Sequence, residues 1–131
     1  MQQQDNPKYS ILVVDDNPPF RHLVAAWLYQ AGYHVVQAND GLDALEQLNR
    51  HKVDLILLDL QMEPLGGFNF REAVGATSYN TIPTILITSD PSSDILMRAS
   101  RMGFDGVMKK PIEQNRLMQM IAQQLDRLKR A

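Results

Sequence analysis

Short apolar runs alternate with longer stretches of helical periodicity along this chain. A short apolar run bounded by polar or turn-forming residues is typical of a strand in a parallel sheet. The run at residues 53–58 is the densest, which indicates a central strand that is buried on both faces. The expected strands cover residues 10–14, 33–37, 53–58, 82–87 and 105–108.

Helical segments separate these runs. Asn17 followed by Pro18 is typical of a helix N-cap with proline at the first helical position, and Gly32 ends that helix. Further helices are expected after residues 39–41, around residues 68–75, between residues 90 and 103, and near the end of the chain. The apolar residues at helical spacing are Phe20, Leu23, Val24, Trp27, Leu28 and Ala31 in the first helix, Ala44, Leu45 and Leu48 in the second, and Leu117, Met120, Ile121, Leu125 and Leu128 in the last. Five strands alternating with five helices predict a parallel sheet with helices on both faces.

Polar residues follow the strands at the points where they end. Asp15 and Asp16 follow the first strand, Asp59 the third and Thr88 the fourth, while Lys110 follows the fifth. Taken singly, each residue has a structural explanation as a helix cap, a turn residue or a local hydrogen-bonding partner. Because parallel strands share one carboxyl edge, where open α/β sheets bind ligands, we expect these side chains to meet. Clustered carboxylates repel one another unless a cation lies among them, and oxygen ligands suit Mg²⁺. The set predicts a metal-dependent phosphoryl site.

Composition narrows the class of protein. The chain has 131 residues, of which 44% are hydrophobic, which suits one domain with a full core. A net charge of −2 does not indicate a nucleic-acid-binding face, and the lack of cysteine excludes disulfides and thiolate chemistry. No apolar run approaches the roughly 20 residues of a membrane span, and the polar residues 1–7 lack the regions of a signal peptide. We expect a cytoplasmic protein that binds neither DNA nor membranes.

The polar residues at the strand ends resemble the signature of a known family, the response regulator receiver domain. The resemblance rests on Asp15 with Asp16, Asp59, Thr88 with Ser89, and Lys110 with Pro111, and it covers roughly residues 9–128. It implies a flavodoxin-like, doubly wound (βα)5 fold with a five-stranded parallel sheet in the order 2-1-3-4-5. Residues 1–131 would then form a single receiver domain without an output module, either as a stand-alone regulator or as a piece of a longer protein.

The resemblance also implies the roles of the acidic residues. Asp59 would be the phosphoacceptor, taking a phosphoryl group from a phosphohistidine of a histidine kinase or histidine phosphotransfer protein. Asp16 and Asp59 would bind Mg²⁺, with Asp15 acting mostly through water and Gln61 offering its backbone carbonyl. The chain would catalyse only its own phosphorylation and dephosphorylation, and would signal to a downstream protein through a changed surface.

Two further roles follow from the same resemblance. Thr88 would donate a hydrogen bond from its hydroxyl to the phosphoryl group. Lys110 would pair with Asp59 before phosphorylation and with the phosphoryl oxygens afterwards. The bond between Lys110 and Pro111 is expected to be cis, which would aim the ammonium at Asp59.

The chain departs from the family pattern at several positions. Val107 stands where the family usually has an aromatic switch residue. Glu63 stands where it usually has proline, and Gly66 where it often has aspartate. Ser89 replaces the usual alanine, so its hydroxyl lies either near the phosphoryl group or in solvent.

Three alternatives remain open at this point. Val107 and Glu63 favour a pseudo-receiver that binds partners without phosphorylation, whereas the complete acidic set and Lys110 oppose it. A Mg²⁺-dependent phosphatase with an aspartyl nucleophile usually carries a second aspartate where this chain has Gln61. A flavodoxin-type cofactor binder would need a Gly/Ser/Thr-rich loop after the first strand, which this sequence lacks.

Overall fold

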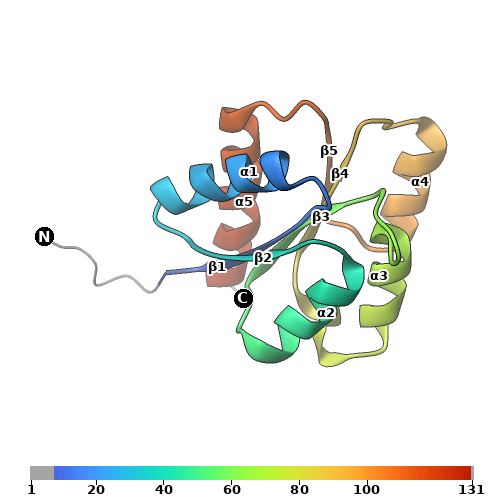
Figure 1. The fold of residues 1–131 in the computed structure, drawn as a ribbon, viewed down its shortest axis with the longest axis horizontal. Helices are drawn as coiled ribbons and strands as arrows, with labels where there is room; N and C mark the ends of the chain where they lie inside the picture. The colour runs from blue at the N-terminus through green and yellow to red at the C-terminus, as the bar shows by residue number, and fades with distance from the viewer. Residues whose placement is uncertain (1–7, 131) are drawn as a thin grey trace, which may run out of the picture.

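A computed structural model describes residues 8–130 and confirms the expected alternation of strands and helices (Figure 1). The polar residues 1–7 lie outside the described residues. The strands are β1 (Ser10–Val14), β2 (His34–Ala38), β3 (Leu55–Asp59), β4 (Thr84–Thr88) and β5 (Gly106–Lys109).

In residues 8–130, four α-helices and one 3-10 helix connect the strands, and a fifth α-helix follows the last strand. They are α1 (Pro18–Gln30), α2 (Gly41–Arg50), α3 (Gly67–Gly75), η1 (Ser78–Thr81), α4 (Ser93–Arg101) and α5 (Gln114–Arg130). Asn17 caps α1 as expected, because its side chain accepts a hydrogen bond from the N–H of Phe20 at 3.0 Å. None of the helices in residues 8–130 is long and apolar enough to cross a bilayer.

The strands form one parallel sheet in the order β2-β1-β3-β4-β5, which confirms the predicted fold class. The chain moves outward from β1 to β2 and then returns to β3 on the other side of β1. Helices α1 and α5 cover one face of the sheet, and α2, α3 and α4 cover the other (Figure 1). The reversal of direction lies between β1 and β3, where doubly wound sheets open a crevice at their carboxyl ends.

The central strand β3 carries the core on both of its faces. All five of its residues are buried. Leu55 and Leu57 pack with residues of α1 and α5, whereas Ile56 and Leu58 pack with residues of α2 and α3. This alternation follows from the period of two residues along a strand, and it fixes Asp59 at the end of a rigid element.

Four strands differ slightly from the sequence prediction: β3 covers Leu55–Asp59 instead of 53–58, β5 covers Gly106–Lys109 instead of 105–108, and β2 and β4 are also shifted. β2 begins and ends one residue later than expected, and β4 begins at Thr84 instead of residue 82. Ile82 instead ends the 3-10 helix η1, which the sequence pattern did not predict. Pro83 follows without an N–H that could join the hydrogen-bonded ladder.

Two leucines expected at core positions are partly open to solvent. Leu23 of α1 is 49% exposed and Leu128 of α5 is 37% exposed, whereas Val24 and Leu28 are fully buried. Because α1 makes contact with the sheet along only one stripe, a residue beside Val24 need not share its burial.

Candidate functional site

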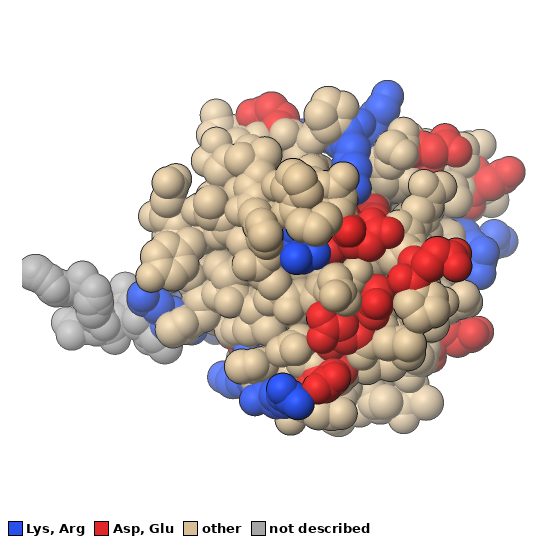
Figure 2. All heavy atoms as spheres, in the orientation of Figure 1, with Lys and Arg blue, Asp and Glu red and all other residues tan. Residues whose placement is uncertain are grey.

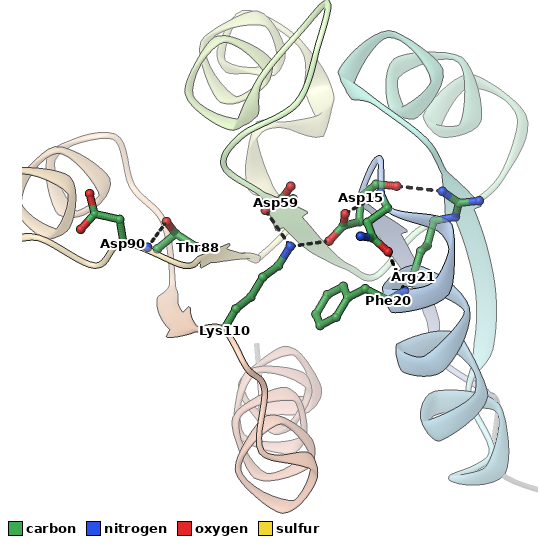
Figure 3. A network of polar contacts seen from close by, with 8 residues as sticks. Asp15, Phe20, Arg21, Asp59, Thr88, Asp90 and Lys110 are labelled. Atoms are coloured by element: carbon green, nitrogen blue, oxygen red, sulfur yellow. Dashed lines mark hydrogen bonds and ion pairs between the residues drawn. The ribbon is translucent and has the colours of Figure 1, made fainter.

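Five of the expected site residues meet at the carboxyl edge of the sheet, and Figure 3 labels four of them, Asp15, Asp59, Thr88 and Lys110. Asp59 and Thr88 are the last residues of β3 and β4. Asp15 directly follows β1, and Lys110 directly follows β5. These four strands are hydrogen-bonded neighbours in the sheet, so residues separated in sequence by up to 95 positions come into contact.

Asp15 is held in place through both its side chain and its backbone. It is only 1% exposed, and its carboxylate accepts hydrogen bonds from the N–H of Asn17 at 2.9 Å and from Lys110 Nζ at 3.0 Å. Its backbone carbonyl accepts a hydrogen bond from Arg21 Nη1 at 2.8 Å. Arg21 in turn donates from Nε to the side chain of Gln37 on β2 at 3.1 Å. The loop between β1 and α1 is therefore anchored to its neighbouring elements.

Three carboxylates converge at this edge in a way that fits a hard divalent cation. Oxygens of Asp15, Asp16 and Asp59 lie within 4.8 Å of one another, and Asp16 is exposed at the mouth of the cluster. Figure 2 shows acidic side chains gathered near the middle of the molecular face that is turned to the viewer, which adds to the local negative potential. Oxygen-only ligands and excess negative charge suit Mg²⁺, so the donor set fits the expected ion.

The surroundings of Asp59 disfavour the ionised form of its carboxyl group. Burial and the negative charge of Asp15, partly opposed by Lys110, together raise the pKa of Asp59 from 3.8 to about 6. The residue is 5% exposed, so few water molecules offset this penalty. A cation bound between the carboxylates would relieve the repulsion and restore the ionised form.

Lys110 bridges the two buried acids. Its ammonium lies 3.0 Å from Asp15 and 3.4 Å from Asp59, so the expected pair with Asp59 is present but the shorter contact is with Asp15. Burial lowers the pKa of Lys110, but its hydrogen bonds to the carboxylates and their negative charges outweigh burial and raise it overall. The peptide bond between Lys110 and Pro111 is cis, as the family resemblance implied. The ammonium also lies over the ring of Phe20 at 4.4 Å from its centroid.

Thr88 points a buried hydroxyl into the same region. It is 1% exposed, and its oxygen accepts a hydrogen bond from the N–H of Asp90 at 3.0 Å. A hydroxyl that accepts one bond still has its proton to donate, so Thr88 can serve an incoming oxyanion. The neighbouring Ser89 is exposed. The acceptor bond ties Thr88 to the loop that leads into α4.

The loop after β3 contains the remaining expected ligand. Gln61 is exposed two residues after Asp59, and the role of its carbonyl stays a prediction. Glu63 is exposed, and its peptide bond to Pro64 is cis. A Cβ added to Gly67 would lie 2.8 Å from the carbonyl oxygen of Asp59. Glycine therefore lets the start of α3 pack directly behind the acidic residue.

Sequence reasoning missed the contributions of Arg21 and Phe20. Both belong to the first turns of α1, and their contacts are with loop and strand-end atoms that lie at other places in the sequence. A basic residue one turn into the helix that follows an acidic strand end is the only sequence signal for Arg21. Nothing in the helical pattern separates Phe20 from a core residue.

Comparison with known proteins places these features in a family. The response regulator receiver domain family matches residues 11–122. The CAI-1 autoinducer sensor kinase/phosphatase CqsS of Vibrio cholerae is 34% identical over 122 residues, which are 92% of this chain and 18% of that protein. The sensor histidine kinase RcsC of Escherichia coli K12 is 31% identical over 127 residues, which are 97% of this chain and 13% of that protein. The chain thus spans less than a fifth of the length of these relatives.

Solved structures agree with the fold. Chemotaxis protein CheY4 of Vibrio cholerae superposes with a TM-score of 0.85 at 30% identity, over 89% of this chain and 98% of that one. The signal receiver domain of a putative LuxO repressor from Vibrio parahaemolyticus gives a TM-score of 0.87 at 25% identity, over 94% of each chain. The strand order, the site residues at the carboxyl edge and the match over most of the chain agree, and the chain belongs to the response regulator receiver domains of two-component systems.

Proposed function

We propose that this receiver domain accepts a phosphoryl group on Asp59 in a Mg²⁺-dependent reaction and signals by changing a protein-binding surface. The donor would be the phosphohistidine of a histidine kinase or histidine phosphotransfer protein. The observation that carries the proposal is the placement of Asp59, buried at the end of β3, 3.4 Å from the Lys110 ammonium and beside two further carboxylates.

Asp59 is suited to act as a nucleophile. One carboxylate oxygen forms a bond to phosphorus while the P–N bond to the donor imidazole breaks, and the imidazole leaves with a proton. At neutral pH a group with a pKa of about 6 is mostly ionised, and its poor solvation keeps it reactive. Water later attacks the acyl phosphate, returning the carboxylate and inorganic phosphate.

The acidic cluster supplies the expected metal ligands. Asp15, Asp16, Asp59 and the backbone carbonyl of Gln61 would hold Mg²⁺. When bound, the ion offsets the repulsion between the carboxylate and the incoming phosphoryl oxygens. Asp15 holds its orientation through Asn17 and Lys110, so the ligand set is arranged before the ion arrives.

Two donors complete the phosphoryl site. The Lys110 ammonium lies between the carboxylates of Asp15 and Asp59. It can pair with Asp59 before phosphorylation and with the phosphoryl oxygens afterwards. Thr88 offers its hydroxyl proton from β4, the next strand of the sheet. Positioned charges and donors of this kind are most of what phosphoryl transfer requires from a protein.

The test combines labelling with three variants. With Mg²⁺ and acetyl phosphate, intact mass spectrometry should show one phosphoryl group, which peptide mapping places on Asp59. Asp59→Asn should abolish the label, and Lys110→Ala should retain Mg²⁺ binding while slowing phosphorylation. Asp54→Asn is the matched control, because it removes a carboxylate beside the other end of β3, where Asp54 accepts a hydrogen bond from Ser10.

The second candidate function is a pseudo-receiver that binds a partner without phosphorylation. Val107 and the exposed Glu63 favour it, since both depart from the usual receiver pattern. Lack of labelling by acetyl phosphate and by every histidine kinase tested would support this candidate, as would a label on a serine instead of Asp59.

A further inference from the structure

The ammonium of Lys110 has a third neighbour besides the two carboxylates. The ring of Phe20 lies with its centroid 4.4 Å from Nζ, within the range of a cation–π contact. Figure 3 shows the ring on the side of the ammonium that faces away from Asp59. Asp59, Asp15 and the ring therefore surround the charge from different directions.

The position of the ring is fixed by the start of α1. Phe20 is the third residue of that helix, and its N–H donates to the capping side chain of Asn17 at 3.0 Å. The side chain is partly buried against the core cluster beneath α1 and α5. Because the same loop carries Asp15, the ring and the carboxylate that face Lys110 are held by one rigid segment.

Lys110 needs such a constraint. Its side chain is 25% exposed and reaches the carboxylates through a flexible four-carbon stem. A lysine of this kind gains conformational freedom by turning outward into water, which opposes its hydrogen bond to Asp15. A ring face 4.4 Å from the ammonium adds an attraction that favours the inward position.

We propose that Phe20 is a positioning residue of the phosphoryl site, whose ring holds the Lys110 ammonium between Asp15 and Asp59. The role rests on the proposed phosphorylation of Asp59. Its consequence is that the ammonium is already in place when the phosphoryl group arrives, so less ordering is left for the transition state.

The competing explanation is that Phe20 only fills space in the core. Substitution of Phe20 by leucine distinguishes this explanation from the positioning role. Phe20→Leu keeps an apolar side chain of similar bulk but removes the ring face, whereas Phe20→Tyr retains the face. Leu23→Ala is the matched control on the same helix, because Leu23 is 49% exposed.

The first readout needs no phosphoryl transfer. In the unmodified protein, ring currents should move the ε-methylene protons of Lys110 upfield in NMR spectra. The upfield shift should persist in Phe20→Tyr and Leu23→Ala and disappear in Phe20→Leu. An ordinary chemical shift for these protons in the unmodified protein would overturn the proposal.

The second readout is the rate of phosphorylation by acetyl phosphate at saturating Mg²⁺. Phe20→Leu should slow it by about two- to fivefold, the factor that a partly exposed cation–π contact represents. Phe20→Tyr should restore the rate, and Leu23→Ala should leave it unchanged. In a Lys110→Ala background, Phe20→Leu should have no further effect.

The outcomes separate this proposal from the proposed function. An unchanged rate in Phe20→Leu, or the same slowing with and without Lys110, would overturn the positioning role while Asp59 remained the phosphoacceptor. If the unmodified protein accepts no phosphoryl group, the proposed function fails and the positioning role, which rests on it, fails with it, whereas the ring-current shift still shows whether the ring lies against the ammonium.

Discussion

Replacing Asp59 by asparagine should stabilise the metal-free protein at neutral pH. The native fold favours the protonated form of Asp59, because burial and the charge of Asp15 raise its pKa from 3.8 to about 6. In the unfolded chain the carboxyl group titrates near its ordinary value. Keeping the group ionised at pH 7 therefore costs the native state free energy, and a neutral amide of similar shape removes that cost.

The magnitude follows from linkage between protonation and folding. Between about pH 4 and pH 6 the native state binds more protons than the unfolded state, so the free energy of unfolding falls as pH rises through this range. At 1.36 kcal/mol per pH unit, the full difference is about 3 kcal/mol above pH 6. Because the pocket relaxes around the new side chain, we expect a gain of about 1–3 kcal/mol for Asp59→Asn at pH 7.5.

Urea unfolding without Mg²⁺ at pH 7.5 and at pH 4 measures this effect. The two proteins should differ at pH 7.5 and agree at pH 4, where Asp59 is protonated in the native state. Glu72→Gln is the control, because it removes one negative charge from an exposed position on α3. Mg²⁺ should reduce the difference in unfolding free energy between the two proteins, because it binds and stabilises the unmodified protein. At one hundred times the dissociation constant, this stabilisation is about 2.7 kcal/mol.

Three results would refute this reasoning. The variant could be no more stable than the unmodified protein at pH 7.5. The difference could persist unchanged at pH 4, which would mean that its cause is not the charge of Asp59. The control Glu72→Gln could give the same gain, which would assign the effect to net charge.

The remaining predictions concern the backbone around the site. Gly67→Ala should lower the free energy of unfolding by about 1–3 kcal/mol, because the added Cβ would lie 2.8 Å from the carbonyl oxygen of Asp59. Gly75→Ala in the same helix meets nothing within 4 Å and should not be destabilising, so urea unfolding of the two variants separates steric conflict from helix propensity. Asn17→Ala should cost about 1 kcal/mol in thermal unfolding, since it removes the cap that accepts the N–H of Phe20.

The sequence predicted which residues meet because parallel strands obey a simple geometric rule. Once the apolar runs are assigned to neighbouring parallel strands, the residues that follow them must share an edge. The strand order and the residues at the strand ends were therefore enough to predict that four side chains lie close together, those of Asp15, Asp59, Thr88 and Lys110. The prediction of a cis bond before Pro111 came from the family pattern, and the structure agrees.

Contacts that depend on side-chain direction could not be predicted in this way. The helical period assigned Leu23 to the core, although it is 49% exposed. It gave no sign that Phe20 faces Lys110, because the twist between α1 and the fifth strand end is set by packing of the whole sheet. The preference of Lys110 for Asp15 over Asp59 is a difference of 0.4 Å, which no residue pattern encodes.

Identical residue types also play different roles at the two ends of the sheet. Asp54 and Asp105 lie before strands, and their carboxylates accept the backbone N–H groups of Ser10 and Thr84, each at 2.8 Å. These acids satisfy the starts of neighbouring strands, whereas the carboxylate oxygens of Asp15, Asp16 and Asp59 lie within 4.8 Å of one another, an arrangement that fits a cation. The distinction becomes visible only when strand register is known.

Because Val107 replaces the usual aromatic residue, the family pattern does not explain how phosphorylation would change a partner-binding surface. The structure indicates which segment would respond. In the usual receiver, the hydroxyl residue at the end of the fourth strand moves toward the phosphoryl group, and an aromatic ring on the fifth strand fills the space. Val107 is half-buried beside Leu86 and has no ring to move. Thr88, however, accepts a hydrogen bond from the N–H of Asp90, so a movement of its hydroxyl would act directly on the loop before α4.

We therefore expect phosphorylation to change that loop more than β5. Amide chemical shifts with and without a beryllofluoride mimic of the phosphoryl group provide the comparison. Large changes should be confined to residues 59–67 and 88–95 and to the immediate neighbours of Lys110. A phosphoryl group can shift the equilibrium only through contacts that differ between the two states, and the proposed contacts are those with Thr88 and Lys110. Equally large changes throughout residues 105–120 would contradict this route and would show that another side chain has replaced the missing ring.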